Sequence, residues 1–157
     1  MRIGYIVAPP ALRARLVALK GIVDRHTSWP VQRAVLALLT DGQLERHIRR
    51  ARRRYAESRA ILRECLAPII DRADSPARLL GLDAGLHACL EFAPDLDTAR
   101  IVRAARERGV AVGPLADYYY GPADRQGLVL GYGGLAHPDL VRGARTLAEV
   151  IAAEHGK

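Results

Sequence analysis

Arginine side chains gather in one short stretch of the sequence. They stand at positions 46, 49, 50, 52, 53 and 54. Guanidinium groups at this density can neutralise the phosphates of a nucleic acid. The alternative is a solvated helix face with ion pairs to Glu45, Glu57 and Glu64. We favour the solvated face, because no aromatic residue is interleaved with these arginines to stack on bases. His47, beside the arginines, is then a surface or subunit-contact residue.

His87 and the run Tyr118–Tyr120 are further candidates for chemistry. Histidine side chains titrate near neutral pH, so a histidine in a cleft is able to carry a proton. The alternation of β-strand residues places His87 on the face opposite Leu86, Leu90 and Phe92. We therefore favour a structural, hydrogen-bonding histidine. The tyrosines either reach a ligand or cover the edge of a sheet, and the sequence leaves both open.

Composition indicates a globular domain with its own core. The chain has 157 residues, half of them apolar, and a net charge of +7. The spacing of Cys65 and Cys89 predicts no metal site, and their apolar surroundings indicate reduced core residues of a cytoplasmic protein. The sequence has no apolar run of about eighteen residues and no secretory signal, so we expect no membrane segment.

A long amphipathic helix is the strongest structural signal, and its predicted bounds are residues 41–67. Asp41 is expected to cap its start, and Pro68 to end it. Such a length favours a bridge between two domains or two subunits. The apolar stripe of this helix consists of Leu44, Ile48, Ala51, Tyr55, Ser58, Leu62 and Cys65.

The remaining segments predict helices first and strands later. Arg2–Pro9 is predicted as a buried strand, and Pro30–Leu39 as a helix buried on several sides. The fold class that follows is α+β, with helices packed on one face of a small, mostly antiparallel sheet. The other expected elements are a helix over 11–22, strands over 78–82, 86–92, 110–115 and 127–132, and helices over 94–108 and 137–154.

Several short motifs occur together in a fixed order. Their positions are Arg2–Tyr5, Ser28 with Gln32, Asp41–Arg59, Ala84–His87, Gly109-Val110, Tyr118-Tyr119 and Leu130–Tyr132. In this order the set resembles the C-terminal part of fold type I, pyridoxal-phosphate-dependent aminotransferases. It is most similar to the aminotransferase-like half of MocR-type regulators of the GntR family and to 2-aminoadipate-type aminotransferases. The resemblance covers essentially the whole chain.

The resemblance implies a domain organisation of the small-domain type. Residues 1–40 would be a remnant of the large-domain edge and linker helices, 41–67 the interdomain helix, and 68–157 the small α+β domain. It also implies pyridoxal 5'-phosphate as cofactor, with Arg2 at the position of the arginine that contacts the cofactor phosphate. The arginine that clamps a substrate carboxylate would fall near Val129, and Arg125 is only a weak substitute.

The resemblance further implies that a cofactor-binding lysine would lie upstream of Arg2. Neither Lys20 nor Lys157 matches it, so we expect no catalytic residue in this chain and no catalysis by the chain alone. Two functions remain open, an aminotransferase-like part of a larger protein and a dimerisation or effector-response module of a regulator. The partners expected are a second copy or the large domain and an amino-acid-like ligand, but neither a membrane nor DNA directly.

Overall fold

The computed structural model describes residues 3–83 and 85–156. The chain divides into two compact units, residues 1–51 and 52–157. The long helix α3, Gln43–Ile70, contributes to both. None of the helices among the described residues combines the length and the apolar composition needed to span a membrane.

The first unit contains α1 (Pro10–Val23), α2 (Trp29–Thr40) and the start of α3. Two predictions fail here. The described residues of the predicted strand, 3–9, form no strand, and Val7 is 88% exposed. A strand needs a neighbouring strand for its backbone groups, and no strand is found beside it among the described residues.

The helix predicted to be buried on several sides, α2, has no buried residue, because an apolar face is buried only where another surface covers it.

The junction between α2 and α3 is a tight reversal at Asp41 and Gly42. Asp41 was expected to cap α3, but it ends α2 instead, and its N–H donates to the Ala37 carbonyl. Gly42 has φ +66°, a left-handed conformation that glycine adopts without strain. The reversal lets α3 begin at Gln43 directly after α2 ends.

The end of α3 also differs from the prediction. Pro68 lies inside the helix, which continues to Ile70. A proline this close to the end removes one intrahelical hydrogen bond and leaves the last turn otherwise intact. Ile69 is 3% exposed, so its burial in the core stabilises that turn.

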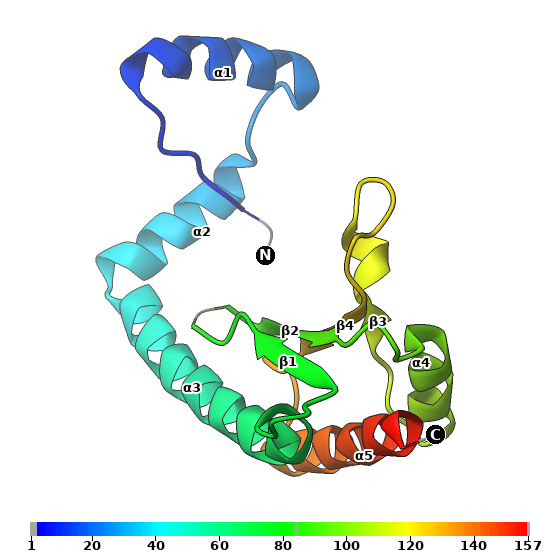
Figure 1. Ribbon diagram of the computed structural model, residues 1–157. Helices are drawn as coiled ribbons and strands as arrows, with labels where there is room; N and C mark the ends of the chain where they lie inside the picture. Colours follow the sequence, from blue (N-terminus) through cyan, green and yellow to red (C-terminus); the bar gives the residue numbers. More distant parts are fainter. Residues whose placement is uncertain (1–2, 84, 157) are drawn as a thin grey trace. The chain divides into compact units, whose positions relative to one another are not determined.

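The second unit contains a four-stranded sheet in which every pairing is antiparallel. The strand order is β1-β2-β4-β3. The predicted α+β class is confirmed, and Figure 1 shows α4 and α5 on one side of the sheet. The bounds are β1 Ala77–Leu80, β2 His87–Phe92, α4 Thr98–Glu107, β3 Gly113–Pro114, a 3-10 turn Leu115–Tyr118, β4 Gly127–Gly131 and α5 His137–His155.

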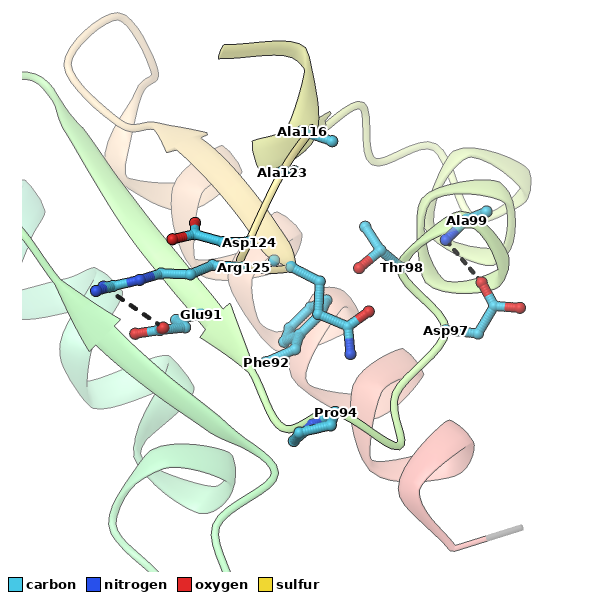
Figure 2. Close-up of a pocket in the computed structure, with 12 residues that line it drawn as sticks. Glu91, Phe92, Pro94, Asp97, Thr98, Ala99, Ala116, Ala123, Asp124 and Arg125 are labelled. Atoms are coloured by element: carbon cyan, nitrogen blue, oxygen red, sulfur yellow. Dashed lines mark hydrogen bonds and ion pairs between the residues drawn. The ribbon is translucent and has the colours of Figure 1, made fainter. Parts of the chain in front are cut away.

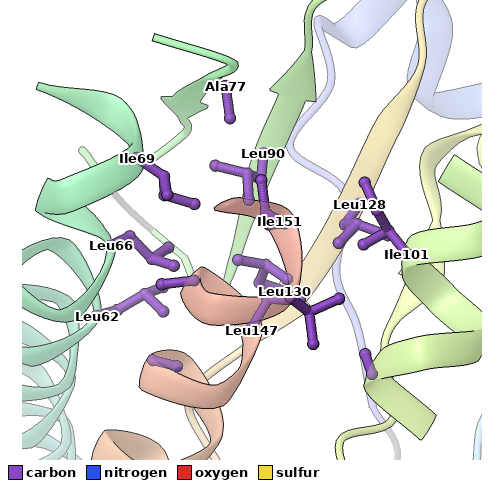
Figure 3. Packing of buried hydrophobic residues seen from close by; sticks show 14 of the residues in the cluster. Leu62, Leu66, Ile69, Ala77, Leu90, Ile101, Leu128, Leu130, Leu147 and Ile151 are labelled. Atoms are coloured by element: carbon purple, nitrogen blue, oxygen red, sulfur yellow. The ribbon is translucent and has the colours of Figure 1, made fainter. Parts of the chain in front are cut away.

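The core lies between one face of this sheet and the helices (Figure 3). Alternate residues of β2 and β4 point into it, and Leu90 and Leu128 are completely buried. From the helices come Leu62, Leu66 and Ile69 of α3, Ile101 of α4, and Leu147 and Ile151 of α5. The side chains at the intervening positions of β2 and β4 therefore lie on the opposite face of the sheet.

Gly127 is fixed by the close approach of β2 and β4. It has φ +152°, and a Cβ there would stand 2.1 Å from the Leu90 carbonyl oxygen. Only glycine allows the two strands to pair at this point. Gly143 in α5 is the opposite case, since a Cβ there meets nothing within 4 Å.

We predict that Gly127→Ala lowers the free energy of unfolding by about 2–4 kcal/mol, from the steric clash and the backbone strain together. Gly143→Ala is the matched control, and we expect it to raise stability by about 0.5–1 kcal/mol through helix propensity. Urea denaturation followed by circular dichroism measures both. Equal stability of the Gly127 variant and the parent chain would contradict the predicted strand packing.

Candidate functional site

The open face of the sheet carries a row of reactive side chains. In the register of β2 and β4, His87 lies opposite Gly131 and Cys89 opposite Val129. Glu91 continues the row on β2. Because their strand neighbours point into the core, these side chains point away from the helices. The sheet thus positions an imidazole, a thiol and a carboxylate on one surface.

The segment before β4 adds polar groups at the end of this row (Figure 2). The Arg125 Nη1 atom lies 3.6 Å from Glu91 Oε1. A hydrogen bond to the Asp124 carboxylate raises the pKa of Tyr119, and the smaller effects of desolvation and of the Asp124 charge act in the same direction. Glu91, Asp124 and Arg125 line both a groove of about 820 Å³ and a neighbouring hollow of about 370 Å³.

The larger groove reaches the start of α4, where the helix amides are already capped. Asp97 Oδ1 accepts hydrogen bonds from the N–H groups of Ala99 and Arg100, at 2.9 and 3.1 Å. This carboxylate satisfies two of the amides that the first turn leaves free. Together with Glu91 and Asp124 it gives the groove lining three carboxylates for its one guanidinium, that of Arg125.

Cys89 is the half-buried thiol in the middle of the row. Burial raises its pKa most, the Glu91 carboxylate raises it further, and Arg125 acts in the opposite direction. A raised pKa leaves less thiolate at neutral pH, so this cysteine is a poor nucleophile. Cys65 and Cys89 are both half-buried. Cys65 packs against the core as predicted, but Cys89 lies on the open face of the sheet, so the prediction of a core residue is wrong for Cys89.

The residues singled out from the sequence are only partly brought together here. Arg2 lies outside the described residues. Val129 is half-buried on the open face, with no charge to offer a carboxylate, and Arg125 faces Glu91. The His87 side chain has no hydrogen-bond partner among the described residues, so the structural role expected for it is not found. Of the three tyrosines, Tyr118 and Tyr120 are exposed.

The sequence did not identify Glu91 and Asp124 as site residues, and it left open whether Tyr119 reaches a ligand or covers the edge of the sheet. Strand alternation placed Glu91 on the same face as His87, and this was the available signal for it. Asp124 and Tyr119 belong to a loop, and no periodic pattern predicts which loop side chains meet.

The arginines of α3 are mostly solvated, as favoured from the sequence. Arg49 pairs with Glu45, and Arg54 donates to the Leu135 carbonyl at 3.3 Å. Among the described residues no ion pair is found for Arg50 or Arg53, nor for Glu57 or Glu64, the other two carboxylates expected to pair with arginines.

The comparisons with known proteins cover nearly all of the chain. It is 29% identical over 157 residues to the probable rhizopine catabolism regulatory protein MocR of Rhizobium meliloti, matching 98% of this chain and 30% of that protein. It is 24% identical to the uncharacterized HTH-type transcriptional regulator YhdI of Bacillus subtilis, over 94% of this chain and 31% of that one. The chain is related to MocR-type regulators and to aminotransferases. No protein-family model matches it.

Solved aminotransferase structures share the fold. The α-aminoadipate aminotransferase LysN of Thermus thermophilus, complexed with N-(5'-phosphopyridoxyl)-L-leucine, superposes with a TM-score of 0.80 at 26% identity, over 96% of this chain and 38% of that chain. The multiple substrate aminotransferase of Thermococcus profundus gives 0.82 at 21% identity, over 95% and 36%. The resemblance inferred from the motifs is confirmed. The chain spans about a third of the length of the relatives it matches.

Pyridoxal phosphate is the cofactor these neighbours imply, and the described residues of this chain do not form a complete site for it. Lys20, the one lysine in the described ranges, lies on α1, where its Nζ pairs with Asp24 at 2.6 Å. The groove on the sheet carries no lysine and an excess of carboxylates, which disfavours a phosphate. The groove is thus unsuited to holding the cofactor without further residues.

Charge substitutions beside Cys89 test the electrostatics of the open face. We predict that Glu91→Gln lowers the pKa of the Cys89 thiol and speeds its alkylation by iodoacetamide near pH 8, by about two- to fivefold. Arg125→Gln is the matched control and has the opposite sign, because it removes the group that lowers this pKa. Peptide mass spectrometry follows Cys89 separately from Cys65. The same change of rate in both variants would contradict the arrangement.

Proposed function

We propose that this chain is the C-terminal part of a pyridoxal-phosphate-dependent aminotransferase-like protein, of the kind found in MocR-type transcriptional regulators. The match to MocR over 98% of the chain carries the proposal. The open sheet face supports it, since half-buried polar groups that line a groove and a hollow are suited to face a ligand or a second domain. Residues 1–40, 41–67 and 68–157 are then the large-domain edge, the interdomain helix and the small domain.

The proposed role of the sheet face is ligand contact without covalent chemistry. Tyr119 and Asp124 offer hydrogen-bonding groups, and Glu91 holds the Arg125 guanidinium to one side. With Val129 at the centre of the face, an amino-acid-like ligand would be bound there without a guanidinium clamp from β4. Arg2 stays a proposed phosphate contact on the strength of the sequence resemblance.

We also propose that the 157 residues do not catalyse transamination by themselves. Transamination requires a lysine amine that bonds the cofactor and then carries protons. The sequence has lysine only at positions 20 and 157. Lys20 is exposed to solvent and ion-paired with Asp24, whereas a reactive amine would lie in a closed site.

The second candidate is a non-enzymatic dimerisation or effector-response module of a DNA-binding regulator. The HTH-type regulators among the relatives favour it. In this function the sheet face senses an amino-acid-like effector, and another part of the protein reads DNA. The gene upstream separates the two candidates, because a winged-helix segment favours the regulator and a directly preceding large domain favours the enzyme.

A cofactor-binding measurement tests the proposed inactivity. We expect that the purified chain, mixed with pyridoxal phosphate and then freed of unbound cofactor, retains no stoichiometric absorbance band of a protein-bound Schiff base. The physical reason is the exposed, paired state of Lys20. Lys20→Ala is the control for adventitious labelling. A stable stoichiometric band that disappears in this variant would refute the proposal.

Sedimentation tests whether the first unit offers a surface to another body. Apolar side chains exposed there include Tyr5, Ile6, Val7, Ile22 and Val23. We predict concentration-dependent self-association. Val7→Glu should weaken it and raise its Kd at least twofold, because a carboxylate is costly to bury. Tyr120 in the second unit is also exposed, and Tyr120→Glu should leave the Kd of self-association unchanged. A monomer at every concentration with a sharp unfolding transition would contradict the proposal.

A further inference from the structure

A cleft with basic walls lies where α2 ends and α3 begins, within the first unit. It has a volume of about 470 Å³ and is lined by Leu38, Gln43, Leu44, Arg46, His47 and Arg50. Its polar walls are one amide, one imidazole and two guanidinium groups. No carboxylate belongs to the lining, although the sequence around it contains Asp41 and Glu45.

Helical spacing directs the basic side chains toward the same side of α3. Gln43, His47 and Arg50 follow one another at intervals of four and three, and Arg46 precedes Arg50 by four. Two guanidinium groups four residues apart on a helix repel each other. An anion held between Arg46 and Arg50 converts this repulsion into two attractive contacts.

The Arg46 guanidinium contacts the backbone just before the start of α3. Its Nη2 donates to the Asp41 carbonyl at 3.3 Å, and its Nη1 lies 3.6 Å from the point where a Cβ on Gly42 would stand. Gly42 leaves room for the guanidinium to lie against the chain. The remaining N–H groups of Arg46 stay available for an acceptor in the cleft.

The neighbouring charges leave the cleft cationic. Glu45 pairs with Arg49, and neither residue lines the cleft. Arg50 has no carboxylate partner in the described part of the chain. The first-turn N–H groups of α3 donate to no capping side chain among the described residues, and they add partial positive charge at the start of the helix.

We infer that this cleft is a binding site for a phosphate group, with Arg46 and Arg50 as its two guanidinium ligands and Gln43 as a hydrogen-bond donor. Phosphate suits the site because guanidinium forks present paired N–H donors to its oxygens. The phosphate is carried by a small anionic molecule, since the cleft has a volume of about 470 Å³ and its lining on α3 extends only from Gln43 to Arg50. The cleft belongs to the first unit and the sheet face to the second, and they share no lining residue, so failure of this inference leaves the proposed function untouched.

An NMR titration of the full 157-residue chain with inorganic phosphate tests the inference, at low ionic strength and constant pH. We expect saturable shifts of the Gln43–Arg50 backbone amides with a Kd below about 1 mM. Arg50→Gln and Arg46→Gln should each raise the Kd about tenfold, as expected for loss of a charge-assisted contact. Arg52→Gln removes the same charge from α3 outside the cleft and should change the Kd less than twofold.

Two further ligands distinguish the sources of the phosphate. A phosphate monoester should bind at least as tightly as inorganic phosphate and shift the same amides. A duplex DNA should bind weakly, lose its affinity near physiological salt and depend equally on Arg50 and Arg52.

Three results would overturn the inference: shifts that do not saturate, equal losses in the Arg50 and Arg52 variants with inorganic phosphate, or tight DNA binding that depends on Arg50 at physiological salt. If one variant fails to fold by circular dichroism, the other arginine variant decides the outcome.

Discussion

The pairing of β2 with β4 over the helical layer is the interaction on which the second unit depends. Leu90 and Leu128 are opposite each other in the register and completely buried. Their burial fixes which residues of both strands face the helices. It thereby fixes the opposite face as well, because a shift of one residue in register would exchange the two faces. The positions of Cys89 and Glu91 therefore follow from the packing of apolar residues beneath them.

This constraint acts on one side of β4 only. The core side is set by packing, and Val129 lies on the other side, where it is half-buried. Because Val129 is uncharged, it needs no negatively charged partner nearby. Arg125 pairs with the carboxylate of Glu91 on β2, the strand next to β4. The open face is polar at its end and apolar at its centre.

Much of the second unit could be predicted from the sequence, and little of the first. The alternation in 86–92 reflects a local burial pattern, and β2 and α5 both lie where they were expected. The strand predicted over 110–115 shrinks to Gly113 and Pro114, because Pro114 lacks an N–H for a longer ladder. The segment 3–9 failed for another reason. Its composition is that of a strand, but a strand also requires a partner, which no local pattern supplies.

The two edges of the sheet limit how this molecule can associate. β1 has four residues and includes the exposed Arg78, and β3 has two and ends in a proline. Short edges with a charge or a proline resist the addition of a foreign strand. Growth of the sheet into an extended, amyloid-like ladder is thus blocked at both sides. Contacts between copies at this sheet are then left to side chains, which makes them reversible and sensitive to single substitutions.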